Sequence, residues 1–279
     1  MKFVRPLPFA EALVKLGVRS IVGADLTSAE WAYVPVALRE RAFFSSRIES
    51  VRFLDRAKNA LMDFLESARE EITAPDGTKT TALKTWGRAR FVEQMREFAI
   101  SEGMGPLDPE DAGTIKDIRS QRRLDLIFDV QTRQAHDYGN WKQGNNPAVL
   151  DEFPAQRFVR VRGVKEPRGE HRIHEGEVRL KSDVGFWTAL NEDFGVPWGP
   201  WGWGCGHDVE DVDRDEAERL GLIDPGEKVQ DVETSFNARL ESSVGKLASD
   251  LLKRLVDALG DKVEIDSNGA IRWKESRSK

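Results

Sequence analysis

The sequence is poor in the residues that form disulfides and metal clusters, because its 279 residues include one cysteine and four histidines. A single cysteine excludes an internal disulfide and suits a reducing compartment. No run approaches the ~20 apolar residues that a membrane helix needs. The first residues also lack the apolar block of a secretory leader. We therefore expect a cytoplasmic protein that makes no contact with a membrane.

The familiar nucleotide-binding and metalloprotease motifs are absent as well. The chain has no G-x-x-x-x-G-K-[ST] loop, no G-x-G-x-x-G step after a strand and no H-E-x-x-H pair. Gly202, Gly204 and Gly206 alternate, but they precede acidic residues and lie outside any strand-to-helix crossover. Nucleotide binding is therefore not expected.

The chain as a whole is not a basic nucleic-acid binder, since its net charge is −6. Residues 208–233 are rich in acids, whereas residues 116–168 are rich in arginine and lysine. Both stretches suit solvated helix faces. Alternatively, the basic stretch meets an acidic partner or nucleic acid. A content of 39% hydrophobic and 32% charged residues predicts a globular protein in either case.

Apolar residues at helical spacing predict most of the chain's secondary structure. Thr27 and Glu30 have capping-box spacing in front of one short helix. The predicted helices of greater length cover residues 9–16, 46–72, 85–101, 113–139 and 235–259.

Strand patterns are confined to two regions. Arg157–Arg162 alternates and Glu177–Leu180 is its expected partner strand. Ser182 or Asp183 then caps a short helix, and Asp213 opens another. Near the end of the chain, residues 263–273 predict a β-hairpin that turns at Asn268 and Gly269. The predicted fold is α+β and mainly helical, with long amphipathic helices around a small mixed α/β module and a C-terminal β-hairpin.

Cys205 and His207 are the first candidates for chemistry. Two residues apart on an extended chain, their side chains lie on one face and can share a metal. His171, with His174 or Asp208 as a fourth ligand, completes a tetrahedral zinc site in this interpretation. In the alternative interpretation, His171 and His207 hydrogen-bond the backbone and hold the surrounding loop in place.

Two catalytic interpretations use the same residues. Cys205 can act as a nucleophile with His207 as its base, but the acids that follow His207 raise the pKa of a thiol rather than lower it. The carboxylates Glu170, Glu175 and Glu177 stand near two histidines and suggest a hydrolase or nuclease. Carboxylates beside histidine are also common on hairpin surfaces.

The segment from Gly199 to His207, GPWGWGCGH, places two tryptophans among alternating glycines. Glycine supplies no rigidity, so such a loop must be held by the burial of its aromatic rings, each worth ~150–250 Å² of contact. We expect Trp198, Trp201 and Trp203 to fill a core beneath the loop.

The order of these features resembles the head-morphogenesis domain of phage Mu F-like minor head proteins. That family carries approximately R-P-x-H, a nearby glycine, D-P-F-W and P-P-x-G-W-x-C-R-C. The helix from Arg122 to Trp141 also resembles the one ahead of that domain, so the likeness covers about residues 120–220. The matching residues are Arg168, His171, Gly176, Phe186, Trp187, Pro200, Gly202, Trp203 and Cys205.

The chain departs from the family pattern in two places. His207 stands at the family's second cysteine and Gly206 at the arginine before it. Val164 replaces an acidic residue, with Glu166 the nearest substitute. Because imidazole replaces thiolate in zinc sites, Cys205 with His207 preserves the option of a metal.

The resemblance implies three regions: a helical N-terminal region at 1–112, the head-morphogenesis domain at 113–222, and a C-terminal helix with hairpin at 223–279. It implies a structural, non-catalytic minor protein of the phage or prophage head that acts in capsid assembly. The implied partners are the portal protein, the major capsid or scaffold protein, and packaged DNA. The implied location is the virion interior near the portal, and the host cytoplasm during assembly.

Two other functions stay open. A metal-dependent hydrolase or nuclease would use His171, Cys205, His207 and Glu170. A DNA-binding module would use the basic stretch, against the net charge of −6.

Overall fold

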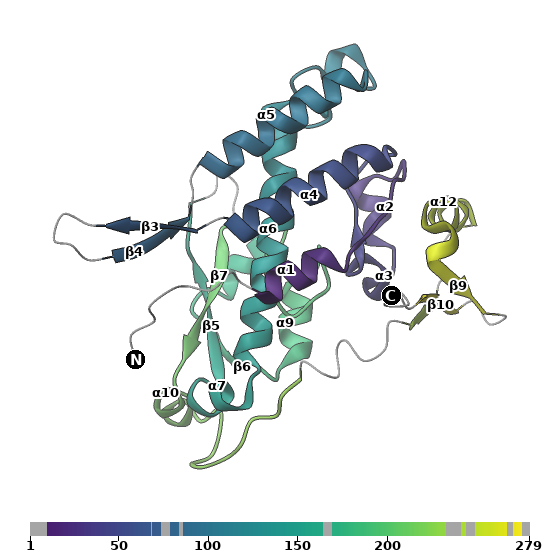
Figure 1. Cartoon of the computed structure of the whole chain (residues 1–279). Coiled ribbons are helices and arrows are strands. Elements are labelled where there is room, and N and C mark those ends of the chain that lie inside the picture. The colour runs from purple at the N-terminus through teal and green to yellow at the C-terminus, as the bar shows by residue number, and fades with distance from the viewer. Residues whose placement is uncertain are drawn as a thin grey trace.

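The computed structural model describes residues 10–67, 69–73, 79–83, 86–163, 169–232, 241–243, 249–266 and 270–274 (Figure 1). About 52% of the chain is helical and 11% is in strands. The predicted fold class, α+β and mainly helical, is confirmed.

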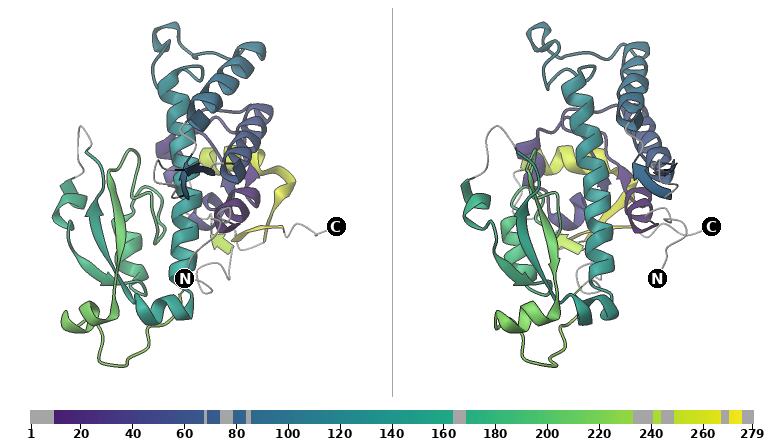
Figure 2. Two further views of the ribbon diagram at one scale, coloured as in Figure 1. Left: turned by 60° about the vertical axis from the view of Figure 1, so that its left-hand side comes forward. Right: turned by 90° about the vertical axis from the view of Figure 1, so that its left-hand side faces the viewer.

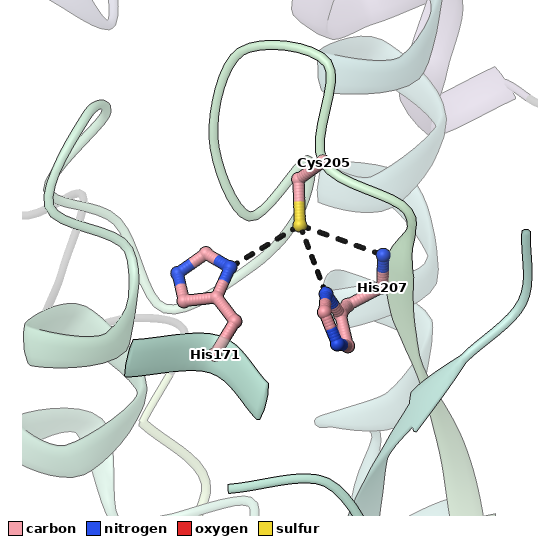
Figure 3. A group of neighbouring side chains, drawn as sticks. All are labelled: His171, Cys205 and His207. Carbon is pink, nitrogen blue, oxygen red and sulfur yellow. Dashed lines mark hydrogen bonds between the residues drawn. The ribbon is translucent and has the colours of Figure 1, made fainter. Parts of the chain in front are cut away.

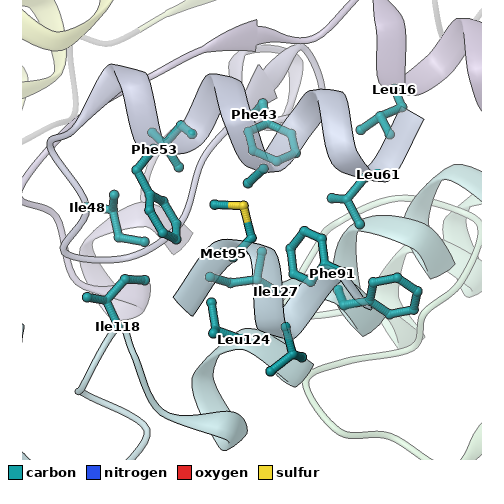
Figure 4. Close-up of a cluster of buried hydrophobic side chains, with 14 of the residues drawn as sticks. Leu16, Phe43, Ile48, Phe53, Leu61, Phe91, Met95, Ile118, Leu124 and Ile127 are labelled. Atoms are coloured by element: carbon teal, nitrogen blue, oxygen red, sulfur yellow. The ribbon is translucent and has the colours of Figure 1, made fainter. Parts of the chain in front are cut away.

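Four helices form the main helical body: α1 (Ala10–Gly17), α4 (Val51–Ser67), α5 (Trp86–Ser101) and α6 (Gln121–Gly144). The apolar residues that predicted these helices face one another. Leu61 of α4, Met95 of α5 and Leu124 of α6 are fully buried in one core (Figure 4). Periodicity in the sequence therefore located this core correctly.

A second, smaller core joins the N-terminal segment to the C-terminal helix. The N-terminal segment contains β1 (Ser20–Ile21), α2 (Ser28–Ala32), α3 (Val36–Arg39) and β2 (Ala42–Phe43), with β1 and β2 parallel. Thr27 and Glu30 form the predicted capping box. Leu251, Leu255 and Leu259 of α12 (Ser249–Leu259) pack against this segment.

Two predicted helices have different bounds. The predicted helix over 46–72 is α4, which ends at Ser67, and Arg69–Thr73 forms strand β3 paired with β4 (Lys79–Leu83). The β-branched Ile72, Thr73, Thr80 and Thr81 favour this pairing over a longer helix. The turn-forming sequence Pro75-Asp76-Gly77 lies outside the described residues.

The helix predicted from Gly113 begins at Gln121 instead. Gly113 has a positive φ of 74°, which no α-helix accepts, and a short 3-10 turn (Pro109–Asp111) precedes it. Ser120 caps α6 by accepting a hydrogen bond from the backbone N–H of Arg123. The same helix continues past the predicted end at residue 139 to Gly144.

The module contains a three-stranded sheet in the order β6-β5-β7, all antiparallel. Its strands are β5 (Ala155–Arg160), β6 (Val178–Leu180) and β7 (His207–Val212). The pairing of β5 with β6 was predicted, whereas β7 was not predicted as a strand of this sheet. The short helices are α7 (Pro147–Glu152), α8 (Gly169–Ile173), α9 (Val184–Leu190) and α10 (Arg214–Arg219). Asp183 and Asp213 cap α9 and α10 as predicted.

The predicted helix over 235–259 is wrong as one continuous element. Glu241–Ser243 forms strand β8, and only Ser249–Leu259 of the described residues is helical. Serine is a weak helix former, and β8 gains a backbone partner in β10 (Ala270–Trp273). Strand β9 (Val263–Ile265), which follows a 3-10 turn (Gly260–Lys262), also pairs antiparallel with β10. The turn at Asn268 and Gly269 lies outside the described residues, so the hairpin stays a prediction.

Helix α6 stands between the other helices of the main body and the three-stranded sheet (Figure 2). Its Leu124 and Ala135 belong to the main core, while Tyr138 and Trp141 pack with Trp198 of the loop. One helix thus sets the position of the module relative to the body. The predicted division of the chain into regions 1–112, 113–222 and 223–279 stays a prediction. No helix in the described part of the chain is long and apolar enough to cross a membrane.

Candidate metal centre and the tryptophan loop

His171, Cys205 and His207 come from three separate segments and meet in the interior (Figure 3). His171 lies on α8. Cys205 lies in the segment between α9 and β7, residues 191–206, here called the tryptophan loop, and His207 is the first residue of β7. Cys205 Sγ is 3.2 Å from Nδ1 of His171 and 3.2 Å from Nδ1 of His207. All three residues are buried, and their ligand atoms lie within 4.8 Å of one another. The predicted ligand trio is therefore brought together.

The other nitrogen of each imidazole fixes its protonation. His171 Nε2 lies 2.9 Å from the carbonyl oxygen of Leu190, which only accepts, so Nε2 carries the proton. His207 Nε2 lies 2.9 Å from Oε1 of Glu175. Hydrogen bonds from Arg160 and then from His207 hold the pKa of Glu175 below its ordinary value, so this carboxylate also accepts. Both Nδ1 atoms therefore present lone pairs to the sulfur.

The cysteine sulfur cannot satisfy both lone pairs, because a thiol has one proton. The backbone N–H of His207 also donates to Sγ, at 3.4 Å. A cation between the three atoms satisfies them all. In a tetrahedral zinc site, Zn–N and Zn–S bonds of the usual lengths place sulfur and nitrogen about 3.5 Å apart. Histidines that bind metals commonly donate their second N–H to a carbonyl or carboxylate, as both do here. The donor set, two imidazoles and one cysteine sulfur, is therefore of a kind that binds zinc.

The predicted fourth ligands lie elsewhere. His174 Nδ1 pairs with Glu177, and Asp208 faces Arg133 with an O–N distance of 3.9 Å. Among the described residues, the group of potential metal ligands contains only the three side chains from α8, the loop and β7. A metal here has a fourth position for water or another group.

The loop around Cys205 is held by aromatic contacts. The Trp201 ring is buried against Phe158 and Trp187, with centroids 5.5 Å away in both cases. The Phe158 ring also stacks on His207 at 4.8 Å, so it links the loop core to the metal ligands. Trp198 is buried separately, against Tyr138 and Trp141 of α6.

Trp203 does not fill the core, contrary to prediction. Its side chain is 39% exposed and rests on Phe194, with ring centroids 5.0 Å apart. Its backbone N–H donates to Asp193 Oδ2 at 2.8 Å, so the loop is tied here by a hydrogen bond. Gly204 directs the chain back toward Cys205 with a positive φ of 67°.

The other residues on which the family resemblance rests lie in turns or in the packed interior of the module. Gly176 has a positive φ of 85°, and its N–H donates to the Phe158 carbonyl at 2.8 Å in the turn before β6. Phe186 is half-buried and packs edge-on against Trp187 at 4.9 Å. Pro200 and Gly202 are buried in the loop. Arg168, Val164 and Glu166 lie outside the described residues.

Two arginines that sequence reasoning did not single out hold the loop from outside. Arg133 of α6 donates to the carbonyl oxygens of Cys205 at 3.2 Å and His207 at 3.4 Å. Arg162 donates to the Cys205 carbonyl at 3.1 Å. Both belong to the basic stretch, but nothing in the sequence connects them to Cys205. The packing of α6 on the module places Arg133, and the pairing of β5 with β7 places Arg162.

The three carboxylates predicted near the histidines have separate roles. Glu175 orients His207, as described, and Glu177 pairs with His174. Glu170 is exposed and lines a cavity of about 570 Å³ together with His171 and His174. Cys205 and His207 are not in that lining.

Comparisons with families of known proteins, with characterised proteins and with solved structures find no match to this chain.

Proposed function

We propose that this chain is a structural minor head protein of the phage Mu F-like type, which acts in capsid assembly at the portal. One observation carries the proposal. Residues of the motifs that resemble this family, spread from His171 to His207, meet around the Phe158 ring and close one compact module. A chance likeness between scattered motifs gives no reason for their side chains to meet.

The burial of these residues supports a structural role rather than a catalytic one. Cys205 is 4% exposed and His207 1% exposed. Their contacts join α8, the tryptophan loop and β7, and Arg133 joins that loop to α6. The cluster therefore holds the segments of the module together and, through Arg133, against α6.

We further infer that this cluster binds a zinc ion through His171, Cys205 and His207. When bound, the ion crosslinks the three segments and neutralises the thiolate. We expect about one zinc ion per chain by elemental analysis of protein purified without added metal. Cys205→Ser and His171→Ala should lose it, whereas His174→Ala, outside the cluster, should keep it. Because the ligands must be deprotonated, zinc affinity should fall as the pH is lowered.

A folded wild-type protein without zinc, whose thermal stability does not change on addition of zinc, would reject the metal. It would leave the structural function standing, because the packing of Phe158, Trp187, Trp201 and Cys205 in one apolar cluster does not depend on an ion.

The apolar faces of the long amphipathic helices α4 and α12 are buried within the chain. Leu54, Leu61 and Leu65 of α4 are in the main core, and the leucines of α12 are in the second core. Contacts with the portal, the major capsid or the scaffold protein must therefore use other surfaces than these apolar faces.

The basic stretch is also largely used internally, which weakens the DNA-binding alternative. Arg157 pairs with Glu210 and Glu216, Arg160 with Glu175, and Arg123 bonds Ser45 and Ser46. Contact with packaged DNA stays part of the head-protein proposal, as a consequence of location rather than of a basic face.

The test of the proposed function is the virion itself. In the phage or prophage that encodes this chain, the gene is expected beside the portal, scaffold or protease, and major capsid genes. Mass spectrometry of purified particles should detect the chain in few copies, and deletion of its gene should reduce the yield of filled heads. Particles that lack the chain and assemble normally would overturn the proposal.

A metal-dependent hydrolase or nuclease is the second candidate. It is favoured by the open fourth position and by the cavity beside His171, since catalytic zinc sites keep a position free. Zinc-loaded wild type should then cleave a nucleic-acid or ester substrate, and His171→Ala should not. Such activity would replace the structural proposal.

A further inference from the structure

A second cavity, of about 380 Å³, lies between α6 and the sheet of the module. Its walls come from the last turns of α6, from β5 and β7, from the end of β6 and from the tryptophan loop. None of the three residues of the candidate metal centre lines it. It is therefore a separate feature of the junction between helix and module.

The charged residues of this cavity are mostly acidic. Asp137, Asp208 and Asp211 line it together with one cation, Lys181. Lys181 Nζ is paired with Asp211 Oδ1 at 2.7 Å. Asp208 Oδ2 lies 3.9 Å from Arg133, which also holds the Cys205 carbonyl. Asp137 alone has no ion pair among the described residues.

Asp137 Oδ2 and Trp201 Nε1, in the wall of this cavity, are buried without a hydrogen-bond partner in the described part of the chain. Trp201 is 1% exposed, so its indole N–H has no access to bulk water. Burial, and then the charge of Asp208, raise the pKa of Asp137 to about 7, although Arg133 opposes this. Buried donors and acceptors left unpaired destabilise the folded chain, so a ligand that pairs both is favoured.

The chain leaves space for this carboxylate. A side chain at Gly199 would place its Cβ 2.5 Å from Asp137 Oδ2 and 3.4 Å from Trp201 Nε1. Gly199 thus lies next to both unpartnered atoms, and any larger residue at this position would crowd the carboxylate.

The occupant is unlike a metal ion. The only described group of ligands close enough to surround one ion is the cluster at Cys205, so the aspartates of this cavity are too dispersed. An organic cation can span them, because a guanidinium or ammonium group presents several N–H donors. An acceptor on the same ligand then suits the indole N–H.

We propose that this cavity binds an organic cation of the guanidinium or alkylammonium class, with Asp137 as its anionic partner and Trp201 Nε1–H as donor to a neighbouring carbonyl. Such a ligand is either an arginine or lysine side chain of a partner protein or a free polyamine. The proposal is independent of the head-protein function.

The test uses three probes with the full-length protein at pH 8, where Asp137 is mostly ionised. They are Nα-acetyl-arginine amide, its neutral isostere Nα-acetyl-citrulline amide, and spermidine. We expect the arginine amide to shift the Trp201 indole N–H signal in ¹⁵N spectra and to bind at least about tenfold more tightly than the citrulline compound. Tighter binding of the arginine amide than of spermidine assigns the site to a protein side chain, and the reverse to a polyamine.

Asp137→Asn keeps the shape of the residue and should weaken arginine amide binding by about tenfold or more. Asp224→Asn, which changes an exposed aspartate remote from the cavity lining, should bind like wild type. Equal binding of the citrulline compound, unchanged binding in Asp137→Asn, or an unmoved Trp201 indole signal would each overturn the proposal.

Discussion

Replacement of Trp201 by alanine is expected to lower the free energy of unfolding by about 3–5 kcal/mol. The ring is fully buried between Phe158 and Trp187, both of which are also fully buried and cannot easily move into the vacated space. Loss of the ring also removes the main apolar anchor of the segment that carries Cys205. Urea denaturation followed by circular dichroism measures the change.

Trp203→Ala is the matched control, since it removes the same side chain two residues later in the same loop. Because this ring is 39% exposed and contacts Phe194 at the surface, we expect a loss of about 1 kcal/mol or less. Equal effects of the two substitutions would mean that Trp201 does not anchor the loop.

The second large effect is expected at a buried ion pair between α1 and the end of α3, which lies beside Tyr138 and Trp198. Lys15 of α1 lies 2.7 Å from Oε2 of Glu40 at the end of α3, and both side chains are less than 10% exposed. The ammonium group also lies 4.5 Å from the centre of the Tyr138 ring and 5.3 Å from that of Trp198. Lys15→Met leaves the Glu40 carboxylate buried without its main partner, so we expect a loss of about 3–5 kcal/mol.

Two further variants isolate the cause. The double variant Lys15→Met, Glu40→Leu should recover most of the loss, because an apolar pair replaces the ion pair without leaving a charge behind. Arg52→Met, which breaks the exposed pair with Glu102, should cost about 1 kcal/mol or less. A double variant as unstable as the single one would show that the aliphatic packing of Lys15, not its charge, is what matters.

The effect of Lys15→Met should also depend on pH. Burial acts to raise the pKa of Glu40, but the charges of Lys15 and Arg19 outweigh it and hold the pKa below its ordinary value of 4.5. The stabilisation is therefore complete above that value and is lost as the pH falls through the pKa of the folded state. The difference between wild type and Lys15→Met should shrink in the same range.

Part of the candidate site was predictable, because it depends on neighbours in sequence. Cys205 and His207 are two residues apart, so an extended chain brings them together without help from the rest of the fold. His171 was added to the predicted site because the chain has few other histidines, and because it also matches the family pattern. The partners that fix both histidine tautomers, Leu190 and Glu175, were not predicted as such, since each comes from a different segment.

The sequence by itself determined the features that depend on hydrogen bonds and packing within a few residues. The capping box at Thr27, the caps at Asp183 and Asp213, and the apolar stripes of α4 and α5 are of this kind. Only the tertiary structure decided the features that require two distant segments to meet. It turned Glu241–Ser243 into a strand, because this segment found a backbone partner in β10, almost thirty residues later. It buried Trp201 and left Trp203 at the surface, although both stand among the same glycines, since burial depends on which side of the loop the sheet covers.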